Sequence, residues 1–225
     1  MNFYEQKFIK NPFTKSQQEK IRRTNFTIVG LGGTGGFILE NLLRVGAENL
    51  TVFDHDRFEL SNFNRQTLAT EEFLDMPKVH AAIARAKNIN KNIKITTFSH
   101  FDGNTKINPS IFLDGTDNIK SKLIMAQTAR KKKIPYVFCS TLASRGIVTT
   151  FTNYKFERAF QLPKNIELKH YQTCSSIICP AASLAGSLAV SQAINFLLKK
   201  PVVIAPDALF FDLDKKDIFW RAKLG

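Results

Sequence analysis

The sequence predicts an α/β protein with a Rossmann-like, mostly parallel sheet flanked by helices and with added antiparallel strands in its C-terminal part. Two patterns carry this prediction. From residue 26 onward, short apolar runs alternate with stretches of helical periodicity, which is typical of consecutive βαβ units. A glycine-rich segment, GLGGTGG at 30–36, follows the first apolar run and opens the first of these helices.

The same patterns predict the individual elements. Strands are expected at 26–29, 50–54, 92–98, 110–115 and 134–140, with helices between them at 34–45, 77–88 and 118–131. Pro77 fits the first turn of its helix, where a missing N–H costs little. Segment 147–152 is predicted to be a further strand that joins the sheet in antiparallel orientation. The nearly apolar segment 181–198 predicts a buried helix, and 208–224 predicts a hairpin with its turn near Asp214.

Length and composition fit one domain. The 225 residues divide into an N-terminal extension (1–25), a nucleotide-binding core (26–140) and C-terminal strands with a buried helix (141–225). A charged fraction of 23% and a hydrophobic fraction of 44% exclude a disordered chain. No apolar run reaches the roughly 18 residues that span a bilayer, and the N-terminus lacks a secretory apolar segment. We therefore expect a cytoplasmic protein without membrane contact.

The net charge of +13 leaves the class of partner open. A basic surface attracts nucleic acid or an acidic protein. The cations are spread along the chain, however, and cluster only at 130–133, where a helix is expected to end. Nucleic acid is thus a possible partner that the sequence does not favour.

The glycine segment and an acidic residue after the second strand indicate a nucleotide. Gly30, Gly32, Gly33 and Gly35 let the backbone approach a phosphate at a helix N-terminus. Asp54 closes the second strand about 20 residues on, where an acid bonds a ribose hydroxyl. These features alone leave NAD, FAD and ATP open.

Polar residues beyond the second strand favour ATP. Asp56 is followed by Leu60-Ser61-Asn62-Phe63-Asn64-Arg65-Gln66 and then by Pro77-Lys78. A redox domain has no use for these groups, whereas a phosphate under attack develops charge that cations stabilise. Asp114 and Asp117 close the fourth strand, where carboxylates face the ligand crevice, and one of the two is well placed to hold Mg²⁺ on the phosphates.

In that order and spacing, GLGGTGG, FDHDRFELSNFNRQ, MPK and DGTDN resemble the ThiF/MoeB/HesA family, relatives of ubiquitin-activating enzymes. SQQEKI (16–21) and the segment 179–198 extend the resemblance over nearly the whole chain. It implies a homodimer that uses MgATP to adenylate the C-terminal carboxylate of a ubiquitin-like sulfur carrier, modifier or ribosomal peptide, with release of pyrophosphate.

The resemblance also implies roles for single residues. Asp54 would bind the ribose, and Gly30, Gly32 and Gly35 would line the nucleotide site. Gly33 and Asp56 would also belong to this site. Asn62, Arg65, Gln66 and Lys78 address the triphosphate. Asp117 coordinates Mg²⁺, with Asp114 as its structural neighbour in the nucleotide site.

Three departures from the family pattern bear on these roles. The family's paired zinc cysteines are absent, so no structural zinc is expected. The N-terminal tract lacks the arginine that relatives supply to the partner subunit's ATP, so Lys7, Lys10, Arg22 or Arg23 substitutes or the role is lost. Cys174 is either a nucleophile that forms a thioester or an inert loop cysteine, while Cys139 and Cys179 read as buried small hydrophobes.

Other functions compete with this interpretation. A tRNA-modifying, ATP-dependent dehydratase of the related branch fits the basic charge, although DGTDN and the late helix fit the carrier-activating branch better. A catalytically silent binding partner fits the missing arginine and zinc cysteines. A redox dehydrogenase lacks a hydride-transfer site. The four histidines show no ligand spacing, and only His55, between two site aspartates, has a suggestive position.

Overall fold

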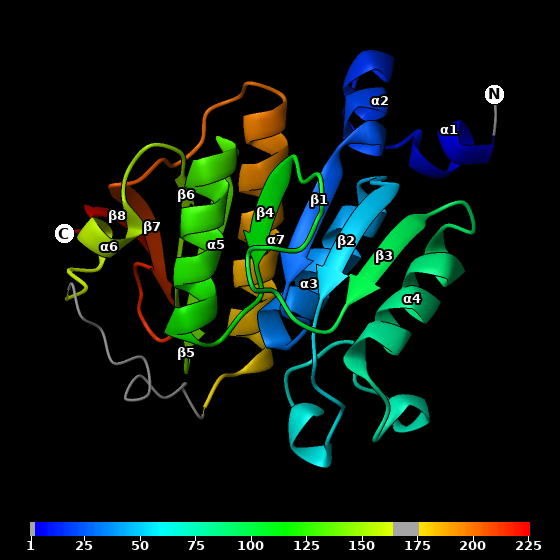
Figure 1. Ribbon diagram of the computed structural model, residues 1–225, viewed down its shortest axis with the longest axis horizontal. Helices are drawn as coiled ribbons and strands as arrows, with labels where there is room; N and C mark the ends of the chain where they lie inside the picture. Colours follow the sequence, from blue (N-terminus) through cyan, green and yellow to red (C-terminus); the bar gives the residue numbers. More distant parts are fainter. Residues whose placement is uncertain (1–2, 164–175) are drawn as a thin grey trace.

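The computed structural model describes residues 3–163 and 176–225 and contains one eight-stranded sheet (Figure 1). The strand order is β3-β2-β1-β4-β5-β6-β7-β8. The first five strands in this order run parallel, and β6, β7 and β8 are added antiparallel. The strands are β1 (Asn25–Val29), β2 (Asn49–Phe53), β3 (Lys94–Phe98), β4 (Ile111–Asp114), β5 (Tyr136–Leu142), β6 (Arg145–Phe151), β7 (Asp207–Asp212) and β8 (Phe219–Lys223). The predicted fold class is confirmed.

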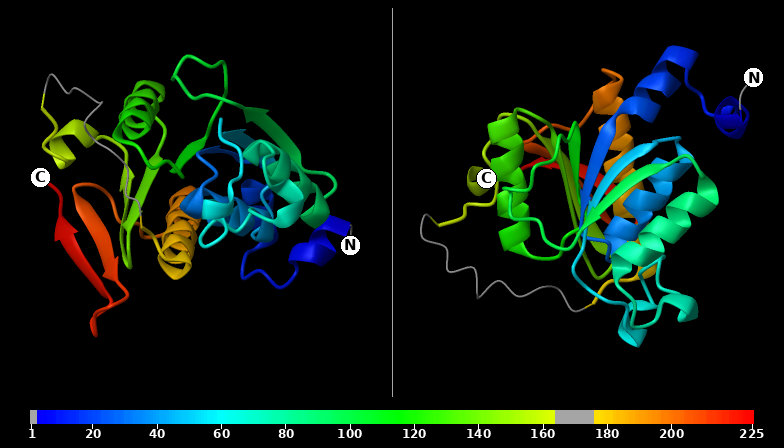
Figure 2. Two further views of the ribbon diagram at one scale, coloured as in Figure 1. Left: turned by 90° about the horizontal axis from the view of Figure 1, so that it is seen from below. Right: turned by 45° about the vertical axis from the view of Figure 1, so that its right-hand side comes forward.

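Helices cover both faces of the sheet. The helices are α1 (Phe3–Phe8), α2 (Lys15–Arg23), α3 (Gly33–Arg44), α4 (Lys78–Ile89), α5 (Ile119–Lys132), α6 (Phe156–Ala159) and α7 (Cys179–Leu197), with 3₁₀ turns η1 (Leu60–Asn62) and η2 (Glu71–Phe73). Helices α3, α4 and α7 share one core cluster, and α5 and α6 share the other. Figure 2 shows α5 and α7 on opposite faces of the sheet.

The predicted elements between 26 and 224 are present, with ends shifted by a few residues. The late helix is buried as expected: alanines 181, 185, 189 and 193 face α3 and the sheet. The N-terminal extension contains two helices that the sequence analysis did not predict. Thr14 begins α2 with a capping box, in which it accepts a bond from the Gln17 amide.

The topology brings three loops to one crevice. Strand β1 lies between β2 and β4, and the chain changes direction across the sheet at this point. In register, Val29 at the end of β1 pairs with Phe53 at the end of β2 and Asp114 at the end of β4. Open α/β sheets bind ligands at such switch points, outside the carboxyl ends of the strands. These ends point to the lower part of Figure 1, where the segment after β2 also lies.

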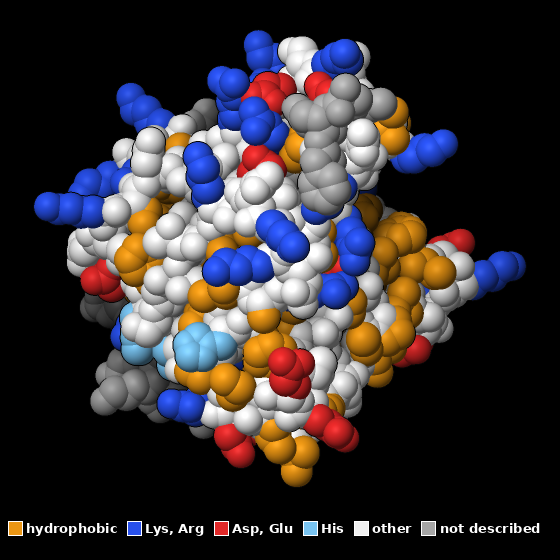
Figure 3. All heavy atoms as spheres, turned by 90° about the vertical axis from the view of Figure 1, so that its right-hand side faces the viewer, with side chains coloured by type: hydrophobic (Ala, Val, Ile, Leu, Met, Phe, Trp, Pro, Cys, Tyr) orange, Lys and Arg blue, Asp and Glu red, His pale blue; other side chains and the backbone are white. Residues whose placement is uncertain are grey.

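The other end of the sheet carries much of the positive charge. Helices α3, α4 and α5 each follow a parallel strand and run back, so their C-termini lie where the strands begin. Basic residues fill their last turns, which suits the helix dipole; they are Arg44, Lys87, Arg130, Lys131 and Lys132. On the face drawn in Figure 3, most Lys and Arg side chains lie over the upper half. Among the residues that the structure describes, no helix is both long and apolar enough to cross a bilayer.

Candidate nucleotide site

Glycines hold the loop after β1 against the loop after β4. Gly30 has φ +88°, and a Cβ there would lie 2.5 Å from the Gly115 carbonyl oxygen. A Cβ on Gly35 would lie 1.9 Å from the Gly30 oxygen, so both positions exclude a side chain. Gly32 differs, because the nearest atom to its Cβ position is Gln66 Nε2 at 3.9 Å. The loop is thus closed on its inner side and open over Gly32, the residue that precedes α3.

Asp54 ties the glycine loop to the end of β2. Its Oδ2 accepts the Leu31 amide at 2.6 Å, and its Oδ1 accepts the Asp56 amide at 2.8 Å. Burial raises the pKa of this carboxyl, and the Lys78 ammonium and the two amides oppose that shift. Asp54 therefore shapes the loop directly, and its role as the ribose ligand stays a prediction.

The segment after β2 folds back onto the glycines. Gly33 faces Arg65, whose carbonyl oxygen and Cγ lie 3.4 and 3.6 Å from a Cβ built on that glycine. Gln66 is only 6% exposed, and its Oε1 has no hydrogen-bond partner among the described residues. Native proteins rarely leave a buried polar atom unpaired without a reason. The Gln66 carboxamide therefore has unused bonding capacity beside the open side of the loop.

Two of the predicted phosphate ligands are bonded within their own segment. Asn62 is buried, and its Oδ1 accepts the Glu59 amide at 3.2 Å, which closes the η1 turn. Arg65 is half-buried and donates to the Ser61 carbonyl and to Asn64 Oδ1, both at 2.8 Å. Asn62 thus supports the turn that carries Arg65, and the guanidinium of Arg65 keeps further donors.

Lys78, the first residue of α4, carries a buried ammonium. Its Nζ lies 3.0 Å from Asp56 Oδ2 and 5.9 Å from the centre of the Phe58 ring. Asp56 also meets His55 Nε2 at 3.3 Å, and the exposed His55 ring stacks on His100 with centroids 4.8 Å apart. The segment after β2 therefore places one cation and one carboxylate together at the rim of the crevice.

The two aspartates after β4 have different environments. Asp114 is 0% exposed and accepts four hydrogen bonds, two from Thr116 and one each from Lys122 and Tyr136. Four bonds fill the acceptor capacity of a carboxylate, so Asp114 has no free acceptor site in this structure, and its place beside the nucleotide stays a prediction. Asp117 is exposed, and its Oδ1 accepts a bond from Asn118 Nδ2 at 3.4 Å.

The two cysteines that the structure describes differ in burial. Cys139 is buried, as predicted, and donates to the Asp114 carbonyl; burial raises the pKa of its thiol. Cys179 was predicted to be buried but is only partly so, because it is the first residue of α7. Cys174 lies outside the described residues. Within the described residues, no group of three or more His, Cys, Asp or Glu side chains is arranged to hold a metal ion.

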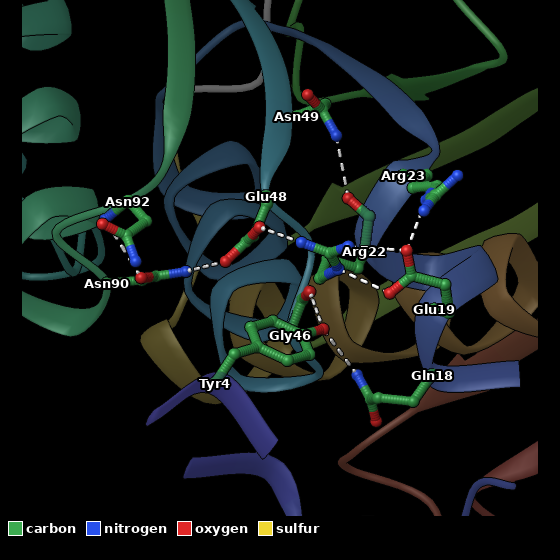
Figure 4. A network of polar contacts seen from close by, with 10 residues as sticks. All are labelled: Tyr4, Gln18, Glu19, Arg22, Arg23, Gly46, Glu48, Asn49, Asn90 and Asn92. Carbon is green, nitrogen blue, oxygen red and sulfur yellow. Dashed lines mark hydrogen bonds and ion pairs between the residues drawn. The ribbon is translucent and has the colours of Figure 1, made fainter. Parts of the chain in front are cut away.

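The N-terminal cations are largely engaged in their own chain. Arg22 bonds Glu19 at 2.6 Å and Glu48 at 3.2 Å, and Arg23 pairs with the same Glu19 (Figure 4). The Lys7 ammonium donates to the Ile89 carbonyl. Lys10 is exposed. Among the contacts between described residues, none of this kind is made by Lys10, unlike the other three candidate substitutes for the missing arginine.

Two side chains that fix Asp114 were not predicted from the sequence. Lys122 and Tyr136 are both buried and both bond its carboxylate. A sequence signal existed for Lys122, because it lies on the same helical stripe as the buried residues Met125 and Ala129. A lysine on a buried stripe needs a buried partner.

Fold and site together define the class: a Rossmann-like α/β protein with polar side chains around a glycine loop at the switch point of its sheet. Residues 4–224 match the ThiF family. The chain belongs to this family.

The relatives are adenylyltransferases. The molybdopterin-synthase adenylyltransferase of Haemophilus influenzae is 28% identical over 197 residues, which cover 81% of this chain and 78% of that protein. The sulfur carrier protein ThiS adenylyltransferase of Bacillus subtilis is 32% identical over 148 residues, or 63% of this chain and 44% of that protein. Escherichia coli MccB, solved with ATP, has a TM-score of 0.78 at 17% identity, and the match covers 93% of this chain and 66% of MccB. At that identity the likeness to MccB concerns the fold.

Proposed function

We propose that this chain is a ThiF/MoeB-type adenylyltransferase that uses ATP to activate the C-terminal carboxylate of a ubiquitin-like sulfur carrier, modifier or peptide, releasing pyrophosphate. The observation that carries the proposal is the packing of Arg65 and Gln66 against the glycines that open α3. The names of the relatives, which act on molybdopterin synthase and on the sulfur carrier ThiS, support the substrate class.

Several features support ATP as the nucleotide. The N-terminus of α3 offers backbone N–H donors and a positive partial charge to a phosphate, and Gly32 leaves space for it. The unpaired Oε1 of Gln66 suits a hydroxyl donor of the nucleotide. Lys78 and Arg65 supply the positive charge that a triphosphate needs and a dinucleotide does not.

Asp117 is our candidate for holding Mg²⁺. Magnesium commonly uses one or two protein carboxylates together with substrate phosphates, so a site without three protein ligands fits this ion. Asp117 is exposed and immediately follows the turn that packs on Gly30. The bound ion would neutralise charge on the phosphates.

The proposed chemistry is one displacement at the α-phosphorus. A carboxylate oxygen of the carrier forms a bond to the α-phosphorus, and the bond from that phosphorus to the β-phosphate oxygen breaks, which leaves pyrophosphate. An α-carboxyl group has a pKa of roughly 3.5, so the nucleophile is ionised at neutral pH and needs no general base. Arg65 and Lys78 would stabilise the charge that develops on the phosphates.

The remaining proposals concern the domain, the oligomeric state, the location and the role of Cys174. We treat 1–225 as a single adenylation domain that works as a cytoplasmic homodimer without structural zinc. Light scattering at micromolar concentration tests the dimer, and a monomer contradicts it. Whether Cys174 receives the acyl group is tested on a non-reducing gel, where Cys174→Ser must abolish a thiol-sensitive conjugate while pyrophosphate exchange persists.

ATP–pyrophosphate exchange tests the function itself. Exchange that depends on a carrier ending in Gly-Gly supports the proposal. Exchange that depends on tRNA supports the dehydratase alternative, and nucleotide binding without exchange supports a silent partner.

A further inference from the structure

A buried polar network lies beneath the turn between β4 and α5. Lys122, on α5, is 6% exposed and donates to Asp114 Oδ2 at 2.9 Å, to the Thr116 carbonyl at 2.7 Å and to the Cys139 carbonyl at 3.2 Å. An ammonium has three N–H donors, and all three are used. One side chain thus joins the end of β4, the turn and β5.

The network is hydrogen-bonded to the turn at Thr116. Its amide and hydroxyl donate to Asp114 Oδ1 at 2.9 and 2.7 Å, while its carbonyl accepts from Lys122. On one side of Thr116 lies Gly115, whose backbone packs against Gly30. On the other side lies the exposed Asp117. The direction in which the chain leaves Gly115, and hence the position of Asp117, depends on these three bonds.

Core stability alone does not require this arrangement. A buried ion pair pays a desolvation penalty, and well-packed apolar residues often replace one without loss of stability. Here one N–H of Lys122 donates to the Thr116 carbonyl, a backbone group of the turn itself. The Phe138 ring lies 5.1 Å from the ammonium and adds a favourable contact. The geometry therefore serves the conformation of the turn.

We infer that Lys122 is a positioning residue for Asp117, acting through Thr116. The inference rests on the proposed function, in which Asp117 holds the Mg²⁺ of MgATP. Lys122 touches neither nucleotide nor metal in this account. It fixes the backbone that presents the carboxylate to them.

Amide hydrogen exchange tests the positioning without any substrate. In Lys122→Met, the Thr116 amide, which donates to Asp114, should exchange about 10-fold faster or more, because local opening becomes easier. Lys122→Arg, which restores a buried cation, should return the exchange rate of this amide to within about 3-fold of wild type. Lys120→Met, at an exposed position of the same helix, is the matched control and should change nothing. If Lys122→Met fails to fold with an unpaired Asp114, the double variant Asp114→Asn/Lys122→Met removes both charges and takes its place.

Calorimetry of ATP binding with and without Mg²⁺ tests the consequence. Lys122→Met should weaken MgATP binding about 10-fold and metal-free ATP binding less than about 2-fold, as Asp117→Asn should. A folded variant with wild-type amide exchange and wild-type metal dependence overturns the inference. A wild-type protein that binds MgATP but never exchanges pyrophosphate contradicts the proposed function and leaves the role of Lys122 intact, so the two failures are distinguishable.

Discussion

The Lys78 ammonium lies 3.0 Å from the Asp56 carboxylate, yet the Lys78 side chain is 6% exposed and that of Asp56 is 53% exposed. A buried cation needs a counterion, and Asp56 supplies it from the solvent side. Because Asp56 has access to water, it can turn away at little cost when a phosphate approaches. The ion pair therefore fixes the position of the Lys78 side chain, and under the proposed function a nucleotide phosphate would replace Asp56 as the partner of its ammonium.

This arrangement predicts the effect of removing either cation. Lys78→Met, which preserves side-chain volume, and Arg65→Ala should each lower the rate of pyrophosphate exchange about 100-fold or more, as expected when a partner of transition-state charge is lost. Melting temperatures should stay close to that of wild type, because Asp56 and Arg65 both reach solvent.

Lys87→Met is the matched control for Lys78→Met, since Lys87 is an exposed lysine of the same helix. It should exchange pyrophosphate at the wild-type rate. Wild-type exchange rates in both Lys78→Met and Arg65→Ala would contradict the assignment of these two residues to the nucleotide site.

Gly35 and Gly32 should respond differently to replacement by alanine. Gly35→Ala places a methyl group 1.9 Å from the Gly30 oxygen, so it should destabilise the fold by at least about 3 kcal/mol or prevent folding. Gly32→Ala has no atom nearer than 3.9 Å and should fold normally. Its methyl group enters the space proposed for phosphate, so ATP binding by calorimetry should weaken at least about 10-fold. Normal ATP affinity in Gly32→Ala would place the phosphates elsewhere.

Docking of the N-terminal helix should depend on alkaline pH. The Tyr4 hydroxyl donates to the Gly46 carbonyl at 2.6 Å, and burial raises the pKa of Tyr4 from 10.0 to about 12 (Figure 4). The folded state thus favours the neutral phenol, so its contribution is complete below pH 10 and is lost as pH rises toward 12. The hydroxyl also accepts a bond from Gln18 Nε2 at 3.0 Å, so Tyr4→Phe loses two hydrogen bonds and should cost about 2 kcal/mol at pH 8.

Urea unfolding of wild type and Tyr4→Phe at several pH values checks this prediction. The difference between the two proteins should shrink between pH 10 and 12. A difference that stays constant over that interval would show that the phenol does not control the docking of α1.

The strand–helix alternation and the glycine loop could be predicted because they are local signals: periodicity marks each element, and a tight turn leaves few alternatives to glycine. The order of strands then brings the ends of β1, β2 and β4 together, so residues such as Asp54 and Asp117 could be assigned to one crevice from their place in the sequence.

Other features depend on contacts between distant residues. Asp114 and Asp117 are three residues apart, and local pattern alone does not separate them, but Thr116, Lys122 and Tyr136 fill the acceptor sites of Asp114 only. Helix α1 has only six residues, and Tyr4 helps to hold it in place by bonding Gly46. Its stability comes from tertiary packing and not from its own sequence, so no periodic pattern revealed it.

The most direct test of the central proposal is exchange of labelled pyrophosphate into ATP by the purified protein, with Mg²⁺ and small carrier proteins ending in Gly-Gly. Carriers with an amidated C-terminus are the matched control, because they lack the ionised carboxylate that attacks the α-phosphorus. The account predicts exchange with the free carboxylate and none with the amide. Equal exchange with both carriers, or none with either while ATP is bound, would contradict it.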